Sequence, residues 1–515
     1  MPRSLARSGL GLLCVLATAA ARADDIPPFP TASIADQAPP VDLSGPVSIQ
    51  ACIGLALGRN FNVRIQQFSI YEAEDSVEIQ KAVFEPVFGF NANKQVVETP
   101  SGQVTVSTSP YASSTYSVSS YSSIDSATFT VNDTLMTGGT VVATAGIAKD
   151  YYQPPYSTPN PAFASTASIA VTQPLLQGAG LDYNRAAIES ARLGVKISNL
   201  NFKSTVLTMV LNVETTYYNL LYQREQYKVQ ADELKQAQQL LDENTVRRQT
   251  GVLTDLDVMN ARAGVASAQN QLLLDQQMVF NSEDGLLQLL GDREFHSKVG
   301  PIAFPDAGEP AVSFARSYKL ARDEGPNLAV AQATIDQFKL AALKAKRNTL
   351  PELNVNGGLG YNSYADTAGQ SITGPWSGYN WTAGITLSVP WGMHANRALY
   401  HQALSQVRSQ EEAYDQADQT LVVSVRSAVR AVETSVQSAR LSADNSRFAA
   451  KAYELTKAQF DAGLATSYLV LQAQNTLETA RVSELQAKVG LLVAVANLRF
   501  LEGSSLQLYR ITLPE

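Results

Sequence analysis

The stretch GVLTDLDVMNAR, residues 251–262, recurs as GLATSYLVLQAQ at residues 463–474, with its glycine and its threonine unchanged. The match extends well beyond this motif. Asn184–Gly291 runs onto Asn396–Gly503 at a constant offset of 212, without a gap. The chain therefore contains the same long segment twice.

A second block repeats at an offset of 265, so that the duplication covers most of the chain. Its paired residues include Val47 and Val312, Leu55 and Leu320, Asn62 and Asn327, Pro86 and Pro351, and Asn91 and Asn356. Each half reads as a short helix, a strand region, a very long helix, a tip and a return helix. We predict a first repeat over 47–300, a second over 301–503 and a tail over 504–515. A duplication on this scale gives a pseudo-symmetric wall and not a globule with one pocket, which indicates a conduit.

The N-terminus has the three parts of an export signal. Arg3 and Arg7 precede an apolar stretch, and Ala21-Arg22-Ala23 offers a small-x-small cleavage site. We predict a signal peptide over 1–23 and a linker over 24–46. Its removal leaves 36 basic against 47 acidic side chains, a net charge of −11, which disfavours nucleic acid as a partner.

One cysteine, Cys52, remains after cleavage, so no intrachain disulfide is possible. We expect it to be small core filler on a short helix.

Two stretches predict very long helices. Neither Val195–Thr250 nor Asn396–Ala462 contains glycine or proline, and both are rich in good helix formers. At 1.5 Å per residue they would reach roughly 85–100 Å. Apolar residues at 4-3 spacing indicate coiled-coil packing. In the first copy they are Val206, Val210, Val213, Tyr217, Leu220, Tyr227, Ala231, Leu234 and Leu241, interrupted by Arg224 and Gln238; in the second they run from Val422 to Ala450 through Val425, Val429 and Val432, interrupted by Ser446.

Four segments alternate apolar with polar or small residues. They surround Phe88 and Phe90, Ala167–Val171, Leu353–Tyr361 and Trp381–Val389. This period of two is typical of outer-membrane barrel strands, although a half-buried soluble sheet shows the same pattern. Four strands per chain are too few to close a barrel, so closure would need several chains. Tyr361, Trp376, Tyr379 and Trp381 are candidate interfacial aromatics.

The first half also carries a long insertion, residues 94–162, rich in Ser, Thr and Tyr. Two apolar runs flank Thr137-Gly138-Gly139, which is a hairpin signal. We interpret the insertion as an exposed loop with an extra hairpin, and the sequence does not decide whether that hairpin extends the barrel.

Nothing in the sequence predicts an enzyme. His394 and His401 are seven residues apart, but no cysteine joins them and no carboxylate stands at ligand spacing. Adjacent acids such as Glu411-Glu412 point apart on a helix. We therefore predict no catalytic site, no metal site and no cofactor.

The ordered set of features resembles the TolC family of outer-membrane channel proteins. The resemblance covers Val47 to about Gly503 and depends on the doubled layout, on the strand-to-helix passage at residues 171–178, and on the tip motif at residues 251–262. It implies a homotrimer whose four core strands per chain make a twelve-stranded membrane barrel, continued by a coiled-coil helical tunnel across the periplasm. The implied fold class is thus mostly α with β.

The resemblance also implies a closable aperture at the helix tips. Asp257, with Asp255 nearby, stands where family members carry acidic lining residues, whereas the second copy has Ser467 and Leu469 there. Phe460 stands where the family can carry a gating tyrosine. A negative charge near a helix N-terminus has a simpler role in helix capping, so Asp255 and Asp257 keep both interpretations. The candidate tip residues are Gly251, Thr254, Asp255, Asp257, Asn260, Phe460, Gly463 and Thr466.

The function that follows is a passive exit duct of a tripartite efflux pump or type I secretion system, located in the outer membrane. Its expected partners are two further copies, a periplasmic adaptor, an inner-membrane transporter and outer-membrane lipid. The alternative is a coiled-coil spacer or surface fibre of the cell envelope, which would not need the strand segments. The cargo is left open.

Overall fold

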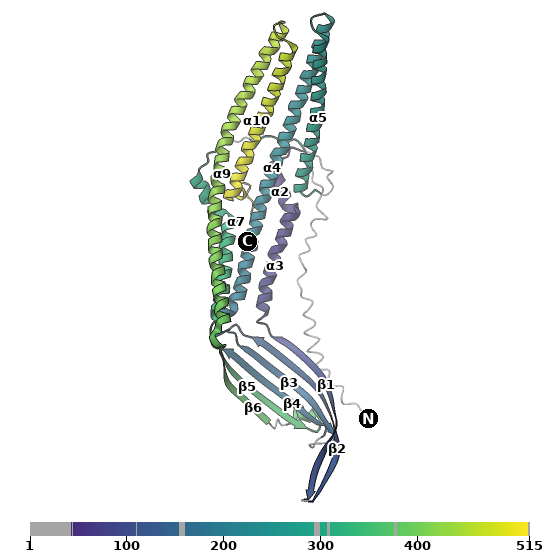
Figure 1. Ribbon diagram of the computed structural model, residues 1–515, viewed down its shortest axis with the longest axis vertical. Coiled ribbons are helices and arrows are strands. Elements are labelled where there is room, and N and C mark those ends of the chain that lie inside the picture. Colours follow the sequence, from purple (N-terminus) through teal and green to yellow (C-terminus); the bar gives the residue numbers. More distant parts are fainter. Residues whose placement is uncertain are drawn as a thin grey trace. The chain divides into compact units, whose positions relative to one another are not determined.

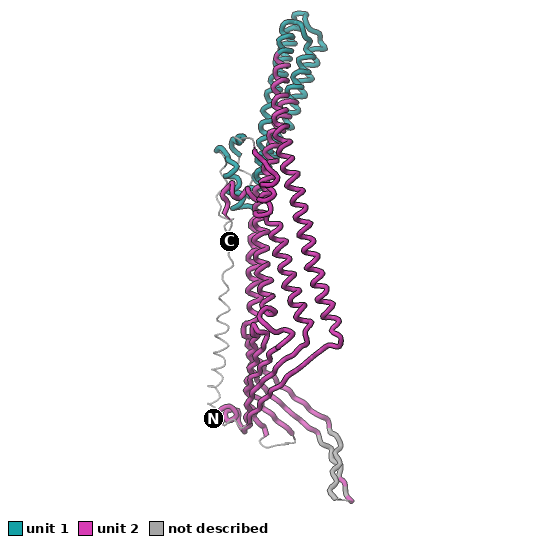
Figure 2. The backbone as a smooth tube through the Cα atoms, turned by 90° about the vertical axis from the view of Figure 1, so that its left-hand side faces the viewer, with its two compact units in different colours: residues 1–61, 213–306, 455–478 teal, residues 62–212, 307–454, 479–515 magenta. Residues whose placement is uncertain are grey.

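The computed structural model describes residues 43, 45–109, 111–153, 160–292, 299–305, 310–374 and 378–512. The predicted signal peptide and Trp376 lie outside this part of the chain, as does nearly all of the predicted linker. The described residues form two compact units (Figure 2). Unit 1 comprises 1–61, 213–306 and 455–478, and unit 2 comprises 62–212, 307–454 and 479–515. Each unit therefore draws on both sequence repeats.

The helices reproduce the duplication almost residue for residue (Figure 1). Each half has helices of 11 and 22 residues, then a long helix of 69 or 68 residues and a return helix of 35 or 36. In the first half these are α2 (Ile49–Arg59), α3 (Phe61–Ala82), α4 (Leu181–Gln249) and α5 (Asp255–Leu289). In the second they are α6 (Phe314–Glu324), α7 (Pro326–Arg347), α9 (His394–Asp461) and α10 (Ser467–Glu502), with the short α8 (Ala368–Thr373), η2 (Trp391–Met393) and α11 (Ser505–Leu508) besides.

Both predicted long helices are confirmed, at about 100 Å each. No helix within the described ranges has both the length and the apolar character needed to cross a membrane.

The predicted coiled-coil seams, which are the rows of apolar residues at 4-3 spacing, are confirmed in part. In α4 the predicted positions Val206, Val210, Val213, Tyr217 and Leu220 are buried, as are Val425, Val429 and Val432 in α9. The prediction was wrong farther along α4, where Tyr227, Ala231, Leu234 and Leu241 are only half-buried. The buried positions there are Gln230, Ala237, Leu240 and Asn244, because polar side chains enter the seam and shift its phase. Ser446, predicted as an interruption, is also buried.

Cys52 is fully buried on α2, as predicted, and burial raises the pKa of its thiol to about 11.

Unit 2 contains a single antiparallel sheet whose spatial order follows the sequence, β1 to β6 (Figure 1). The strands are β1 (Val87–Ser109), β2 (Ala112–Thr134), β3 (Thr140–Gln153), β4 (Ala162–Pro174), β5 (Glu352–Ala365) and β6 (Gly378–Ser388). The four predicted strand segments are β1, β4, β5 and β6. The predicted hairpin at Thr137–Gly139 is the β2–β3 connection.

The interpretation of residues 94–162 as an exposed loop was wrong. Most of this insertion is strand, and β2 and β3 lie between β1 and β4 in the same sheet. Serine and threonine suggested a loop because they satisfy backbone groups in turns, but they also suit the polar face of a two-faced strand.

Candidate functional site

The candidate tip residues lie on two helical turns within unit 1. Gly251 follows α4 and Gly463 follows α9, with φ of +82° and +75°. A left-handed residue at this position lets the amide groups that follow bond back to the last helical carbonyls, as Val252 does to Arg247 and Leu464 to Gln459.

The first turn is closed by a reciprocal cap. The Thr254 side chain accepts from the Asp257 amide at 3.4 Å, and the Asp257 carboxylate accepts from the Thr254 amide at 2.9 Å and the Thr254 hydroxyl at 2.6 Å. These bonds, the hydroxyl's first, lower the pKa of Asp257. The second turn has half of this arrangement, because Thr466 Oγ1 accepts from the Leu469 amide at 3.4 Å but leucine returns no bond.

The remaining first-turn candidates are exposed. Asp255 pairs with Arg248 at 2.5 Å, and Asn260 faces solvent. The two aspartates therefore bind groups of their own hairpin, which favours the capping interpretation of Asp257.

Phe460 is buried, at 2 % exposure, and Arg247 of the other hairpin covers its ring at 4.1 Å. Arg247 also donates to the Phe460 carbonyl at 2.9 Å and to Asp461 at 3.1 Å. One guanidinium thus holds the end of α4 against the end of α9 by a cation–π contact and two charge-assisted bonds.

A second link between the hairpins is fully buried. Asn244 on α4 donates to the Ser467 hydroxyl at 2.6 Å. Sequence reasoning identified neither Arg247 nor Asn244. The only signal in the sequence was the place of Asn244 among good helix formers, seven residues before Gly251.

Farther along the return helices lies a buried polar group. Asp275, at 2 % exposure, accepts from Gln226 at 3.1 Å and from Gln271 at 3.0 Å. Burial raises the pKa of Asp275, and burial followed by the Asp275 charge raises the pKa of Glu478. Gln474 on α10, four residues before Glu478, is also buried, and neither polar atom of its side chain has a hydrogen-bond partner among the described residues.

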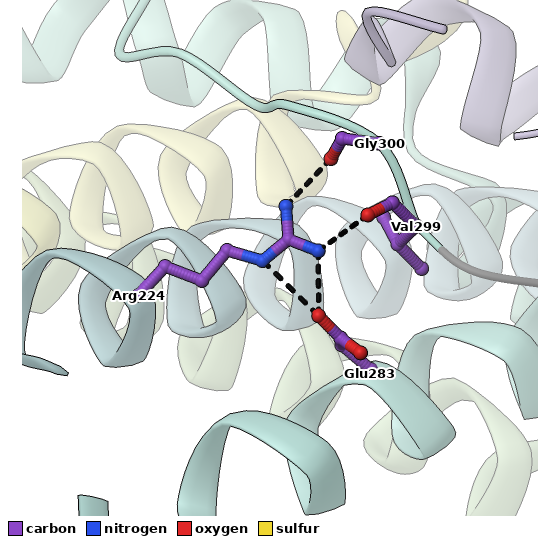
Figure 3. A network of polar contacts seen from close by, with 4 residues as sticks. All are labelled: Arg224, Glu283, Val299 and Gly300. Atoms are coloured by element: carbon purple, nitrogen blue, oxygen red, sulfur yellow. Dashed lines mark hydrogen bonds and ion pairs between the residues drawn. The ribbon is translucent and has the colours of Figure 1, made fainter. Parts of the chain in front are cut away.

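Arg224, which interrupts the predicted seam, ties a connecting segment to the helices (Figure 3). Its guanidinium donates to the carbonyls of Val299 and Gly300, each at 2.6 Å, and to Glu283 on α5 at 2.6 and 3.2 Å. The interruption is therefore a structural link from α4 to α5 and to residues 299–300.

The chemistry available at these sites is ion pairing and helix capping. In the part of the chain that the structure describes, no three His, Cys, Asp or Glu side chains form a group able to hold a metal ion.

The tips also expose apolar side chains. They are Val252, Leu256 and Met259 on the first hairpin and Leu464, Tyr468 and Leu469 on the second.

Curated relatives match over roughly 60 % of the chain. The pyoverdine export outer membrane protein OpmQ of Pseudomonas putida is 29 % identical over 324 residues, which are 60 % of this chain and 66 % of OpmQ, just under two thirds. Outer membrane protein TolC of Vibrio cholerae is 22 % identical over 321 residues, covering 61 % of this chain and 72 % of TolC.

Solved structures match nearly the whole chain. The Campylobacter jejuni CmeC outer membrane channel gives a TM-score of 0.64 at 15 % identity and covers 88 % of this chain and 85 % of CmeC. The open Neisseria gonorrhoeae MtrE channel gives 0.62 at 18 % identity and covers 91 % and 95 %. These likenesses confirm the predicted fold class.

The model of the family described as outer membrane efflux protein matches residues 155–292 and 317–504, more than half of the chain. The predicted resemblance is thereby confirmed, and the outer membrane is the location of this protein. The chain belongs to the outer membrane efflux protein family.

Proposed function

We propose that this chain is the passive outer-membrane exit duct of a tripartite efflux pump or type I secretion system, and that it works as a homotrimer. The observation that carries the proposal is the two-faced sheet. One face presents exposed apolar side chains, among them Phe88, Tyr361, Trp381 and Ile385, while the alternate positions are Asn, Thr, Ser and Gly. A sheet with these two faces is suited to lipid on one side and water on the other.

The partners follow from the tips. A periplasmic adaptor, and through it an inner-membrane transporter, would dock on the two hairpin turns, where exposed apolar residues surround Gly251 and Gly463. The aperture would be formed by the turns of three chains, with Thr254, Asp255, Asp257, Asn260, Phe460 and Thr466 among its residues. Arg247 would hold it shut by joining the hairpins within each chain.

Acidic residues at such an aperture would attract cations. Asp255 is the better candidate for this effect, because its side chain is 78 % exposed whereas Asp257 is engaged in the helix cap. Two relatives named for pyoverdine export make pyoverdine one cargo worth testing.

The test is conductance in a planar lipid bilayer. Protein extracted from outer membranes with detergent should insert and give discrete current steps, larger for cations than for anions. A chain that is soluble without detergent and conducts nothing would contradict the proposal and favour a spacer or fibre. Genes adjacent to this one would separate the two systems, since a proton-driven pump argues for efflux and an ATP-driven exporter for secretion.

A further inference from the structure

The inserted strands β2 and β3 continue the two faces of the sheet without a break. One apolar row crosses all six strands, from the β1 edge to the β6 edge: Phe90, Phe129, Ala145, Ala167, Tyr361 and Tyr379. The next apolar row on that face is Phe88, Val131, Ala143, Ile169, Leu359 and Trp381. Between them, on the opposite face, lie Gly89, Thr130, Thr144, Ser168, Gly360 and Asn380.

This register is informative because a shift of one residue would place every side chain on the wrong face. A surface loop that had only added a hairpin to the edge of a sheet would not need to keep this register. The inserted strands instead carry the alternation that lipid on one side and water on the other require.

The inserted hairpin also runs the full length of its neighbours. Its turn lies where the sheet meets the helices, and the Thr137 hydroxyl bonds Gln173 at 2.9 Å while the Gly180 amide donates to the Thr137 carbonyl at 3.2 Å. Gly138, with φ +90°, fits there because a Cβ atom would lie 2.2 Å from the Gly178 carbonyl. In Figure 1 the β2–β3 turn lies at the helix-facing end of the sheet, so β2 and β3 extend over the same part of the sheet as β4 and β5.

The sheet has two edges, β1 and β6, and these run in opposite directions because six strands alternate. The β6 edge of one copy can therefore pair antiparallel with the β1 edge of the next. In lipid neither edge can stay open, since unpaired backbone groups have no water to bind.

We propose that the membrane barrel of this protein has eighteen strands, six from each of three chains, with β2 and β3 as barrel strands. The inference rests on the trimeric duct proposed above. Since barrel diameter grows roughly linearly with strand number, the barrel would be about 1.5 times as wide as one with four strands per chain. Porins of 16–18 strands leave an aqueous channel, so such an outlet would pass bulky hydrated cargo.

Engineered disulfides test the arrangement in full-length protein in outer membranes, on a C52A background. Paired residues on adjacent strands lie within disulfide reach. We expect A145C/A167C to link within one chain, joining β3 to β4. F90C/A167C should not link, because β2 and β3 separate β1 from β4. Mass spectrometry of the cross-linked peptides measures both.

A deletion variant supplies the matched control. Removing residues 112–153 takes out β2 and β3 together and leaves β1 antiparallel to β4, so F90C/A167C should link in that variant. In the full-length chain, a link at F90C/A167C with none at A145C/A167C would overturn the eighteen-stranded barrel.

Disulfides between chains, formed in the same membranes, test the trimer separately. Because closure of a barrel staggers the register of its strands, F90C or V96C on β1 is combined in turn with a cysteine at Tyr379, Trp381, Ile385 or Leu387 of β6, and one of these combinations should join one chain to another on a denaturing gel. If chains are linked to one another, and if F90C/A167C links in the full-length chain while A145C/A167C does not, the duct stands but its barrel has twelve strands. A soluble protein without any chain-to-chain link would overturn the duct, and the barrel with it. A strand count from electron cryomicroscopy of the detergent-extracted protein should give eighteen, and twelve would refute the inference.

Discussion

At the scale of single residues, two arginines on α4 connect segments that are far apart in the sequence. Arg247 reaches Phe460 and Asp461, over more than 210 residues, and Arg224 reaches residues 299–300. Both place a delocalised charge against carbonyl oxygens, for which the planar guanidinium is well suited.

Replacing Arg247 should loosen the hold of one hairpin on the other. R247M removes two charge-assisted bonds and the contact with the Phe460 ring, with an expected cost of about 2 kcal/mol in that contact. In a planar bilayer we expect higher conductance and more frequent opening than in the unmodified channel. K451M is the control, because Lys451 pairs with Glu454 on its own helix and both side chains are exposed. Equal effects of the two variants would argue against Arg247 as a link between hairpins.

Replacing Arg224 should make residues 299–305 more mobile. R224M leaves Glu283 and two carbonyls without their donor, which should lower stability by about 2–3 kcal/mol. Hydrogen exchange at Val299 and Gly300 should accelerate, and the melting temperature should fall. R192M, which breaks an exposed pair with Glu189, should change little, under about 0.5 kcal/mol. Unchanged exchange at residues 299–300 in R224M would contradict this role.

The buried Asp275 predicts a dependence of stability on pH. Since its pKa and that of Glu478 are raised, the folded protein binds these protons more tightly than the unfolded chain does. Ionisation is therefore a cost, which is relieved as the pH falls through the raised pKa values toward the ordinary 3.8 and 4.5. The melting temperature should rise from pH 8 to pH 5.

D275N keeps an acceptor for Gln226 and Gln271 but carries no charge. It should melt higher than the unmodified protein at pH 8 and show a flatter pH dependence. D232N, an exposed substitution on α4, should leave the profile as it is. A D275N profile parallel to that of the unmodified protein would show that Asp275 is not the source.

At the scale of elements, the helices and turns were predictable because they depend on residues that are close together in the sequence. Helix-forming residues without glycine gave α9 and the part of α4 that follows Gly194, and Gly251 and Gly463 gave the turns that follow these helices. The capping role of Thr254 was predictable from its spacing to Asp257.

Contacts between distant segments were not predictable. The Asn244–Ser467 bond joins residues 223 apart, and it depends on which faces of two helices meet. The strands of the insertion were missed for a related reason. Strand pairing is non-local, and the polar side chains of β2 and β3 become interpretable only when their register against β1 and β4 is known.

The β2–β3 turn offers an element-scale test. G138A places a Cβ against the Gly178 carbonyl and forces a left-handed conformation that costs an alanine about 1–2 kcal/mol. We expect less folded barrel, measured as the fraction of protein that resists unfolding in detergent at room temperature. G384A is the control, because a Cβ on this β6 glycine meets nothing within 4 Å. A normal folded fraction in G138A would show that the turn tolerates a side chain.

At the scale of the whole molecule, the duplication gives each chain two hairpin tips of the same kind, so a trimer presents six. Their exposed apolar residues are expected to dock an adaptor. V252D/L464D should reduce efflux by roughly tenfold or more, because burying an unpaired carboxylate in an interface costs several kcal/mol. Trimer assembly and bilayer conductance should be retained, since both side chains are exposed. V252L/L464M keeps the apolar surface and should retain efflux; normal export by the aspartate variant would exclude these residues from docking.

The two tips also differ in one respect that matters for motion. The return helix α5 begins with a reciprocal cap, whereas α10 begins with Thr466 alone and a leucine where α5 has Asp257. Helix ends with fewer satisfied amides fray more readily. Around a ring of three chains, firm and soft hairpins would thus alternate, and any iris-like dilation would begin at the three soft ones.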